Sequence, residues 1–552
     1  MVLPRTALTV VLVLPCLLRG QSNDSPQPPG IPVTDALVIA KCGSCHTRNA
    51  QGDMQNISWV RATPEAWGDA LKRMVRRNRV ALTPQEARAI VEYLSTYHGL
   101  APEEAASVKY LAEHRMIQDE SNVPNDHVRR ACTNCHTFGR ALSWRRSPEE
   151  WKQIAGLHAD LYPNRSQPLQ SEEAISFLIQ AAPLHTPEWD AWSAQLRTPQ
   201  LTGRWLVTAH LPGHGQYYGE MEIQAGSDPG EFSSRVKLQS VQDGSITLRS
   251  GQSLVYAGYA WRGRSKSNSP ASVGPDDLSS EMHEVLWFAP DQSSAEGRWF
   301  WGQQQEFGMD VRLRRATDAP ALLGLDRPAL KAGSQANRIR LFGDHLPAKL
   351  PPASLVLGPG ITLRSLASQS ANEAVAEVDV SAQAPLGKRD ISLSGAVLPG
   401  GLAIYDRVDY VKVTPDSAVV QFGDESLSRS YQQYEAIGYQ RGSDGLAHTA
   451  DDVALGPVDV TWSLDEFSWA PGGSKPAIGV LSAGGLYEPA ANGPRNNYDV
   501  WVVATAKNEK DQGGQPLMDK SYLVVSVPEY TLNGRHYVRE LGHWVEDGAG
   551  GH

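Results

Sequence analysis

Two copies of one short motif constrain this chain more than any other feature of its sequence. The motif is Cys-x-x-Cys-His, and it occurs at residues 42–46 and again at residues 132–136. In such a motif both thiols bond covalently to the vinyl groups of a haem, and the adjoining His binds the iron from the proximal side. The sequence therefore predicts two covalently bound haem c groups. The predicted attachment residues are Cys42, Cys45 and His46 for the first haem, and Cys132, Cys135 and His136 for the second.

A zinc site or a redox-active dithiol is the main alternative for a Cys-x-x-Cys pair. Neither of these needs a His directly after the second Cys. The chain has the full arrangement twice among only five cysteines, so we favour haem attachment.

The fifth cysteine, Cys16, lies in a segment with the features of a secretory signal peptide. Arg5 precedes an apolar run over residues 7–18, and small and polar residues follow, so we assign residues 1–22 to the signal peptide. The apolar run is too short to span a bilayer, and no small residue precedes Cys16 as in a lipoprotein, so we expect no membrane anchor. Since bacterial c-type cytochromes generally receive their haem outside the inner membrane, we expect a periplasmic protein.

The charge of the chain restricts its partners. A net charge of −10 and a pI of about 5.9 argue against binding to nucleic acid or to an anionic membrane surface. Any docking patch for a partner protein must then be local. Without the leader, every remaining cysteine belongs to a haem motif, so no thiol is left for a disulfide.

The chain before residue 200 has a helical pattern that repeats itself. After the first motif comes TPEAW at residues 63–67, and after the second comes SPEEW at residues 147–151. We expect two cytochrome c-like folds in tandem over residues 23–198, each holding its haem between an N-terminal and a C-terminal helix. Apolar residues recur at three- and four-residue intervals in the ranges 66–75, 84–96 and 149–158, and Thr83 with Glu86 forms a capping box.

The repeat also proposes the distal iron ligands. Met74 follows Trp67 by seven residues, and His158 follows Trp151 by the same seven. We therefore predict Met74 on the first iron and His158 on the second. Because a thioether favours reduced iron and a second imidazole favours oxidised iron, electrons are expected to run from the second haem to the first. Other candidates are Met54 and Met116 for the thioether, and His98, His114, His127 and His185 for the imidazole.

Arginines cluster around the proposed ligand Met74, and two more occur in the second half of the helical region. Guanidinium groups bind carboxylates through paired donors, so some of these arginines could pair with haem propionates. A solvated basic face is the simpler interpretation. The cluster comprises Arg73, Arg76, Arg77 and Arg79 in the first half, with Arg145 and Arg146 in the second.

After residue 200, short alternating runs between turn residues predict β structure. Residues 199–317 are expected to form an antiparallel β-barrel, and residues 318–413 and 414–552 two immunoglobulin-like β-sandwiches that act as scaffold and contact surface. The barrel runs are 204–209, 220–224, 235–240, 245–249, 254–261, 284–288 and 297–301. Five tryptophans could line a ligand pocket, although a barrel core is favoured; they are Trp205, Trp261, Trp287, Trp299 and Trp301.

One loop, residues 444–452, carries oxygen ligands that could suit calcium. Its spacing does not match a twelve-residue calcium loop, which needs acidic or amide groups at alternate positions and a closing Glu. We therefore favour a polar turn.

Several segments together resemble the α subunit of quinohaemoprotein amine dehydrogenase. The similarity runs along nearly the whole chain after the leader, and its combination of haem motifs with three β domains is more specific than the motifs alone. The segments are 63–67 leading to Met74, Trp151 leading to His158, 405–407 before 413–416, and 451–456.

The resemblance implies a periplasmic αβγ enzyme that oxidises primary amines to aldehydes and ammonia. In that family the amine reacts with a cysteine tryptophylquinone on the small γ subunit, and the β subunit is a propeller. The α subunit holds two haems that drain the quinone, and electrons then leave to a soluble carrier such as a copper protein or a cytochrome c. The family's haem ligation, one bis-His and one His/Met, agrees with the pattern of the repeat.

The cysteine count supports this division of labour. A cysteine tryptophylquinone needs a Cys sulfur, and all four cysteines after the leader belong to haem motifs, so we expect no catalytic residue on this chain. Two other functions stay open. A dihaem peroxidase would have one haem with a vacant or displaceable distal position. A haem-bearing binding module would use its β domains to hold a partner or a sugar.

Overall fold

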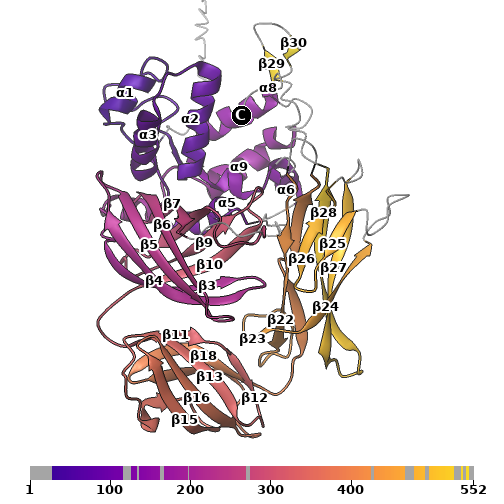
Figure 1. Ribbon diagram of the computed structural model, residues 1–552. Coiled ribbons are helices and arrows are strands. Elements are labelled where there is room, and N and C mark those ends of the chain that lie inside the picture. Colours follow the sequence, from indigo (N-terminus) through magenta and orange to yellow (C-terminus); the bar gives the residue numbers. More distant parts are fainter. Residues whose placement is uncertain are drawn as a thin grey trace, which may run out of the picture.

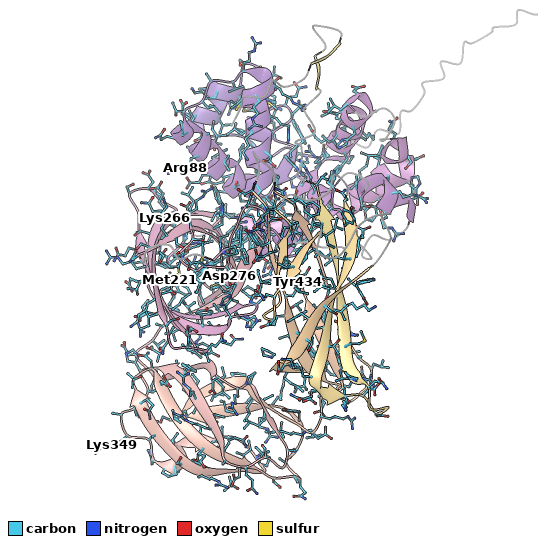
Figure 2. The ribbon with its side chains drawn as sticks, turned by 45° about the vertical axis from the view of Figure 1, so that its right-hand side comes forward. Arg88, Met221, Lys266, Asp276, Lys349 and Tyr434 are labelled. Carbon is cyan, nitrogen blue, oxygen red and sulfur yellow. The ribbon has the colours of Figure 1, made fainter. Side chains whose placement is uncertain are left out.

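The computed structural model describes most of the chain. The described residues are 28–115, 126–133, 136–161, 167–196, 198–268, 274–423, 428–466, 478–491, 497–527, 536–538 and 543–545. The predicted signal peptide, Met116 and the thiol of Cys135 lie outside them. Helices occupy one end of the molecule, the barrel lies directly beneath them, and the last β region stands alongside the barrel (Figure 1). In the turned view, the barrel, marked by Met221, and the last β region, marked by Tyr434, again stand next to each other (Figure 2).

The first cytochrome-like unit consists of three helices around an apolar core. Helix α1 (Ala36–Cys42) ends at the first cysteine of the motif, α2 (Pro64–Asn78) carries Met74, and α3 (Pro84–Tyr97) closes the unit. The predicted capping box is confirmed, because Thr83 Oγ1 accepts from Glu86 N–H while the Glu86 carboxylate accepts from Thr83 N–H. The core buries Val38, Trp67 and Ile90 among other residues.

The second unit repeats this arrangement. Its helices are α6 (Asp126–Thr133), α7 (Gly139–Leu142), α8 (Pro148–Leu161), the short η1 (Gln167–Gln170) and α9 (Glu172–Ala181). Between the units lie α4 (Pro102–Ala106) and α5 (Lys109–Ala112), and α10 (Pro187–Ser193) follows the second unit. Among the described residues, no helix has the length and apolar character needed to cross a bilayer.

A two-stranded ribbon joins the two units. Strand β1 (Val60–Ala62) pairs antiparallel with β2 (Trp144–Arg146), and each strand runs directly into the helix that bears a proposed distal ligand. The paired residues Arg61 and Arg145 occupy equivalent places, 84 positions apart. The ribbon therefore pairs equivalent strands of the two units.

Eight strands form a closed barrel in the order β10-β3-β4-β5-β6-β7-β8-β9. The favoured core interpretation of the tryptophans is confirmed: all five lie in one apolar cluster, and Trp205, Trp261 and Trp299 are fully buried. The strands are β3 (Gly203–Leu211), β4 (Gly215–Ala225), β5 (Glu231–Ser240), β6 (Ile246–Tyr256), β7 (Ala260–Ser267), β8 (Met282–Phe288), β9 (Ser294–Trp301) and β10 (Phe307–Arg315).

One predicted barrel strand is wrong. The run 254–261 is not a single strand but the end of β6, a turn, and the start of β7. Ala257 and Gly258 adopt left-handed φ values of 51° and 79°, which is the backbone twist of a tight hairpin. The alternation of apolar residues continues across this turn, so the pattern alone does not locate it.

The barrel also anchors the helical domain. Ala105, Val108 and Ala112, from the segment between the cytochrome-like units, join the apolar core of the barrel. The Tyr259 hydroxyl donates to Leu100 O over 3.0 Å, and Trp287 Nε1 donates to the Glu113 carboxylate over 3.0 Å. The two domains therefore share a continuous packed interface.

Two further β regions follow the barrel, each built around its own apolar core. The first has two four-stranded sheets, β11-β13-β16-β15 and β12-β18-β17-β14. The second has sheets β19-β22-β23, β20-β28-β27-β24 and β21-β26-β25. The immunoglobulin-like assignment of these regions stays a prediction.

The bounds of these elements complete the description of the fold. The first region comprises β11 (Ala321–Leu325), β12 (Ala329–Lys331), β13 (Asn337–Asp344), η2 (Pro352–Ser354), β14 (Leu355–Val356), β15 (Ile361–Ser370), β16 (Glu373–Val380), β17 (Gly387–Leu393) and β18 (Ala396–Tyr405). The second comprises β19 (Tyr410–Thr414), β20 (Ser417–Gln421), β21 (Gln432–Gln433), β22 (Glu435–Gln440), β23 (Val453–Pro457), β24 (Val460–Glu466), β25 (Gly479–Leu481), β26 (Leu486–Pro489), β27 (Tyr498–Lys510) and β28 (Pro516–Ser526). A terminal hairpin consists of β29 (His536–Val538) and β30 (His543–Val545).

Candidate haem-binding sites

The first motif forms a tight turn at the end of α1. The N–H groups of Cys45 and His46 both donate to Cys42 O, over 3.1 and 2.9 Å. This turn brings the thiols of Cys42 and Cys45 to one end of the helix, where Cys42 is half-buried and Cys45 is exposed. Burial, with the neighbouring Cys45 thiol, raises the pKa of Cys42. In the second motif, Cys132 is buried in α6.

Three predicted histidine ligands share one hydrogen-bond pattern. Nδ1 of His46 donates to Gln55 O over 2.9 Å, Nδ1 of His136 to Thr137 O over 3.0 Å, and Nδ1 of His158 to Ile154 O over 2.8 Å. A carbonyl oxygen only accepts, so in each ring Nδ1 carries the proton and Nε2 carries the lone pair. This is the tautomer that binds a metal through Nε2, with the ring oriented by the carbonyl.

The competing histidines have different surroundings. His185 uses Nε2 to donate to Pro29 O over 2.8 Å, and His127 pairs Nε2 with the Ser171 hydroxyl over 2.7 Å. His98 is fully buried at the end of α3. The contacts of His127 and His185 favour His158 over these two residues as the distal imidazole, and the choice of His158 stays a prediction.

Met74, the predicted distal ligand of the first iron, lies on α2. It lies two turns after Trp67 on the same face of α2, it is half-buried, and its Sδ accepts from Asn78 Nδ2 over 3.2 Å. By contrast, Met54 is fully enclosed in the apolar core of the first unit. A side chain that ligates haem iron must reach the crevice between the helices, so the burial of Met54 favours Met74.

The helices that carry Met74 and His158 are held by equivalent hydrogen bonds. Trp67 Nε1 donates to His98 O over 2.8 Å, and Trp151 Nε1 donates to Ala182 O over 3.0 Å. Trp151 lies 84 positions after Trp67, and Ala182 lies 84 positions after His98. The same separation relates His158 to Met74. The two proposed distal ligands therefore occupy equivalent places in the structure as well as in the sequence.

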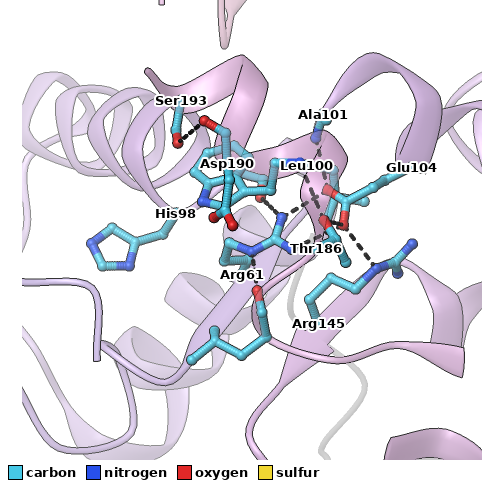
Figure 3. Close-up of polar contacts among 12 residues, drawn as sticks. Arg61, His98, Leu100, Ala101, Glu104, Arg145, Thr186, Asp190 and Ser193 are labelled. Atoms are coloured by element: carbon cyan, nitrogen blue, oxygen red, sulfur yellow. Dashed lines mark hydrogen bonds and ion pairs between the residues drawn. The ribbon is translucent and has the colours of Figure 1, made fainter. Parts of the chain in front are cut away.

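A buried charge cluster lies at the centre of the ribbon (Figure 3). Nη1 and Nη2 of Arg61 donate to the two oxygens of Glu104 over 2.7 and 2.9 Å, and Arg145 Nε donates to the same carboxylate over 3.2 Å. The Thr186 hydroxyl and Ala101 N–H each donate to Glu104 over 2.9 Å. Burial alone would raise the pKa of Glu104, but the hydrogen bonds and charges of Arg61 and Arg145 outweigh it and lower the pKa.

A series of aromatic and cation–π contacts links helices α2 and α8 across the ribbon. Trp67 of α2 meets Trp144 edge to face, with 5.6 Å between ring centroids. The Arg146 guanidinium lies 4.5 Å from the Trp144 ring centroid and 5.6 Å from that of Trp151 in α8. Burial, and then the charge of Arg73, lowers the pKa of Arg146 to about 10, although Glu150 opposes the shift.

These contacts correct part of the arginine interpretation. Arg145 and Arg146 are not a solvated face, because Arg145 binds Glu104 and Arg146 is packed between tryptophans. In the first half, however, Arg73, Arg76 and Arg77 are exposed, as a solvated basic face requires.

The loop 444–452 is closed by its own polar groups. The Asp452 carboxylate accepts from the Tyr410 hydroxyl and from the N–H groups of Gly442 and Thr449, and Asp451 accepts from Ser443 and Thr449 hydroxyls. A polar turn accounts for these contacts. Within the described ranges, no group of three or more His, Cys, Asp or Glu side chains is placed to hold a metal ion.

A groove of about 1460 Å³ separates the barrel from the last β region. At one side of it, His210 Nε2 lies 2.7 Å from Glu435 Oε2, and Gln216 donates to His210 Nδ1 over 3.0 Å. Burial would lower the pKa of His210, but the hydrogen bond and charge of Glu435 outweigh it and raise the pKa. This pair bridges the two regions of the chain.

The fold and these sites together define a haem-binding subunit with a helical N-terminal domain and three β regions. Four family models match the chain in order. They are the haem-binding part of "Quinohemoprotein amine dehydrogenase A, alpha subunit" at residues 33–173, and the alpha-subunit domains II, III and IV at residues 198–316, 319–406 and 411–534. The chain belongs to the family of quinohemoprotein amine dehydrogenase α subunits.

The search of curated proteins finds no match. A de novo designed fluorescence-activating β-barrel is 22% identical, with a TM-score of 0.18, and the match covers 22% of this chain and all of that one. The amine-binding protein of Rhodnius prolixus, solved with tryptamine, is 11% identical with a TM-score of 0.17, over 21% of this chain and 63% of that one. An ICAM-5 ectodomain fragment is 11% identical with a TM-score of 0.11, over 59% and 96% of the respective chains.

Proposed function

We propose that this chain is the electron-transfer subunit of a periplasmic quinohaemoprotein amine dehydrogenase. It would accept electrons from a tryptophylquinone on a partner subunit during oxidative deamination of primary amines. It would then pass them to a soluble carrier such as a copper protein or a cytochrome c. Family membership supports an oxidoreductase made of several subunits, with haem on this one.

The duplicated ligand arrangement is the observation that carries this proposal. Two Cys-x-x-Cys-His motifs precede two equivalent helices, and those helices present Met74 and His158 at matched positions. One haem site would suit many redox enzymes. Two six-coordinate sites with different distal ligands suit a protein that moves single electrons between two potentials.

Each residue has a defined task in this proposal. The paired thiols of each motif would tether one haem, and the rings of His46 and His136, held at Nδ1 by backbone carbonyls, would offer Nε2 to its iron. Met74 and His158 would complete the coordination and separate the two potentials. Haem bound in this way supplies one-electron chemistry at the iron.

The substrate-reacting group is proposed to lie on another chain. All four cysteines after the predicted leader belong to haem motifs, so this chain has none to donate to a cysteine tryptophylquinone. The expected partners are a β-propeller subunit and a small quinone-bearing subunit. The three β regions of this chain offer the surface for them.

Purification from the native periplasm tests the proposal. We expect a complex whose smallest subunit stains for quinone, and addition of a primary amine should bleach the oxidised haem spectrum. The ferric spectrum should show two low-spin, six-coordinate haems. A five-coordinate, high-spin haem that reacts with peroxide would instead favour the peroxidase, and haems that no amine reduces, in a chain without a quinone partner, would favour the binding module.

A further inference from the structure

The C-terminal half of α2 carries an unusual concentration of positive charge. Five of the eight residues from 72 to 79 are Lys or Arg, and no Asp or Glu occurs from residue 70 to residue 85. Arg140 of α7 adds its charge to that of Arg73. We call this set the α2 basic patch; it comprises Lys72, Arg73, Arg76, Arg77, Arg79 and Arg140, all exposed.

Most charges of the patch are not compensated. Lys72 pairs with Asp69 over 3.1 Å, but among the residues that the structure describes, Arg76, Arg77 and Arg79 form no ion pair. Burial and then the charges of Arg140 and Arg77 lower the pKa of Arg73, although Asp69 opposes them. The side chains therefore repel one another.

Helix stability explains only part of this pattern. Cations in the last turn of a helix interact favourably with its dipole, which accounts for Arg76 and Arg77. Arg73 lies earlier in the helix, and its three- and four-residue spacing to Arg76 and Arg77 places like charges side by side, which destabilises a helix. Arg140 comes from a different helix of the other unit.

The patch surrounds an apolar spot. Val75 has 41% of its area exposed, and the neighbouring Met74 is half-buried. An apolar centre with a charged rim is the usual anatomy of a protein interface, and short-lived redox complexes have small ones. Because Met74 is the predicted ligand of the first haem, a protein seated here would lie close to that haem.

We propose that the α2 basic patch is the docking surface for an acidic, soluble electron-carrier protein. This inference rests on the proposed function. The whole chain has a net charge of −10, so an acidic carrier is repelled by the average surface and attracted to this one place. Complementary charge steers such encounters and makes their rates depend on ionic strength.

Stopped-flow oxidation of the reduced native complex tests the proposal. The variant Arg76→Glu with Arg77→Glu reverses two charges of the patch. Arg235→Glu with Lys237→Glu makes the same change of charge on exposed positions of β5 and serves as the matched control. The oxidants are ferricyanide, tris(phenanthroline)cobalt(III), an acidic plastocyanin-type copper protein and a basic cytochrome c.

The patch variant should react about tenfold more slowly with ferricyanide and with the acidic copper protein at low ionic strength. It should react faster with the cationic oxidants, and both differences should vanish in about 1 M salt, where the Debye length is about 3 Å. The control variant should behave like the wild type. The neutral pair Arg76→Gln and Arg77→Gln should give a smaller change of the same sign, and it remains informative if charge reversal prevents folding.

Three results would overturn the proposal. The first is equal rates for the patch variant and the control. The second is a loss of haem absorbance or a shifted haem potential with an unchanged salt dependence, which would assign the arginines to haem propionates. The third is binding to anionic vesicles that the patch variant loses, with unchanged carrier kinetics. A colourless protein would instead refute the proposed function itself, so the two failures are distinguishable.

Discussion

Replacement of Glu104 by Gln tests whether the buried cluster of Glu104, Arg61 and Arg145 stabilises the ribbon between the two cytochrome-like units. The substitution keeps the shape of the side chain and removes its charge. Arg61 is 0% exposed and Arg145 is 6% exposed, so both guanidinium groups would stay in the protein interior without a counter-charge. One of the paired donors of Arg61 would also face an amide N–H in place of a carboxylate oxygen.

The expected cost follows from this geometry. Removing one partner of a buried ion pair typically costs about 3–5 kcal/mol, because an uncompensated charge remains. At the lower end, about 3 kcal/mol corresponds to a roughly hundredfold increase in the population of opened molecules. The loss should be concentrated where the cluster lies, at the ribbon formed by β1 and β2.

Glu104 also predicts a pH dependence. The pKa of Glu104 in the folded protein lies below the ordinary Glu value of 4.5, so its contribution to stability is present above pH 4.5. That contribution is lost as the pH falls through the folded pKa. The Gln variant cannot titrate at this position, so its ribbon should lack this component of the acid-induced loss.

Hydrogen exchange measured by mass spectrometry is the suitable assay, because it reports the free energy of local opening. Ribbon amides of the Gln variant should exchange about a hundredfold faster at pH 7 than those of the wild type. Glu103→Gln is the matched control, since Glu103 is exposed next to Glu104. An acceleration below about fivefold, or an equal effect of the control, would refute the reasoning.

Three more substitutions probe other parts of the molecule. Met74→Ala should abolish the ferric sulfur-to-iron charge-transfer band while Met54→Ala retains it; persistence of the band in the first variant would remove Met74 from the ligand set. Burial lowers the pKa of His98 to about 4, so the unfolded state binds a proton first and wild-type stability should fall by roughly 3 kcal/mol between pH 6.5 and pH 4. In His98→Leu, the free energy of unfolding measured with urea should change less between pH 6.5 and pH 4 than in the wild type. An unchanged pH dependence would contradict the lowered pKa of His98. Because the pKa of His210 is raised, its pairing with Glu435 stabilises the fold below pH 6.5 and is lost as the pH rises through the folded pKa. Glu435→Gln should therefore cost more stability at pH 6 than at pH 9, and equal costs would show that the pair carries no charge.

Local signals in the sequence were sufficient to predict the position of several helices in the helical domain. Thr83, Pro84 and Glu86 form a capping box, and α3 begins at Pro84 as predicted. The repeated spacing from Trp67 to Met74 and from Trp151 to His158 predicted equivalent helices, which the structure shows as α2 and α8. Both signals depend on neighbours within one or two helical turns.

The charge cluster could not be predicted in this way. Glu104 follows Pro102 and Glu103 at the start of a short helix, where acidic residues are usually exposed. Its burial depends on Arg61 and Arg145, which lie 43 and 41 positions away. For the same reason, the burial of Arg146 between two tryptophans is visible only when the ribbon pairs the two units.

Covalent attachment of haem is the claim on which the account depends most directly. The protein should be extracted with acidified acetone, which removes non-covalent haem, and then assayed as the pyridine haemochrome. The account predicts two haems per chain that resist extraction, one of which is lost when Cys42 and Cys45 are both replaced by Ala. A colourless protein after extraction would contradict it.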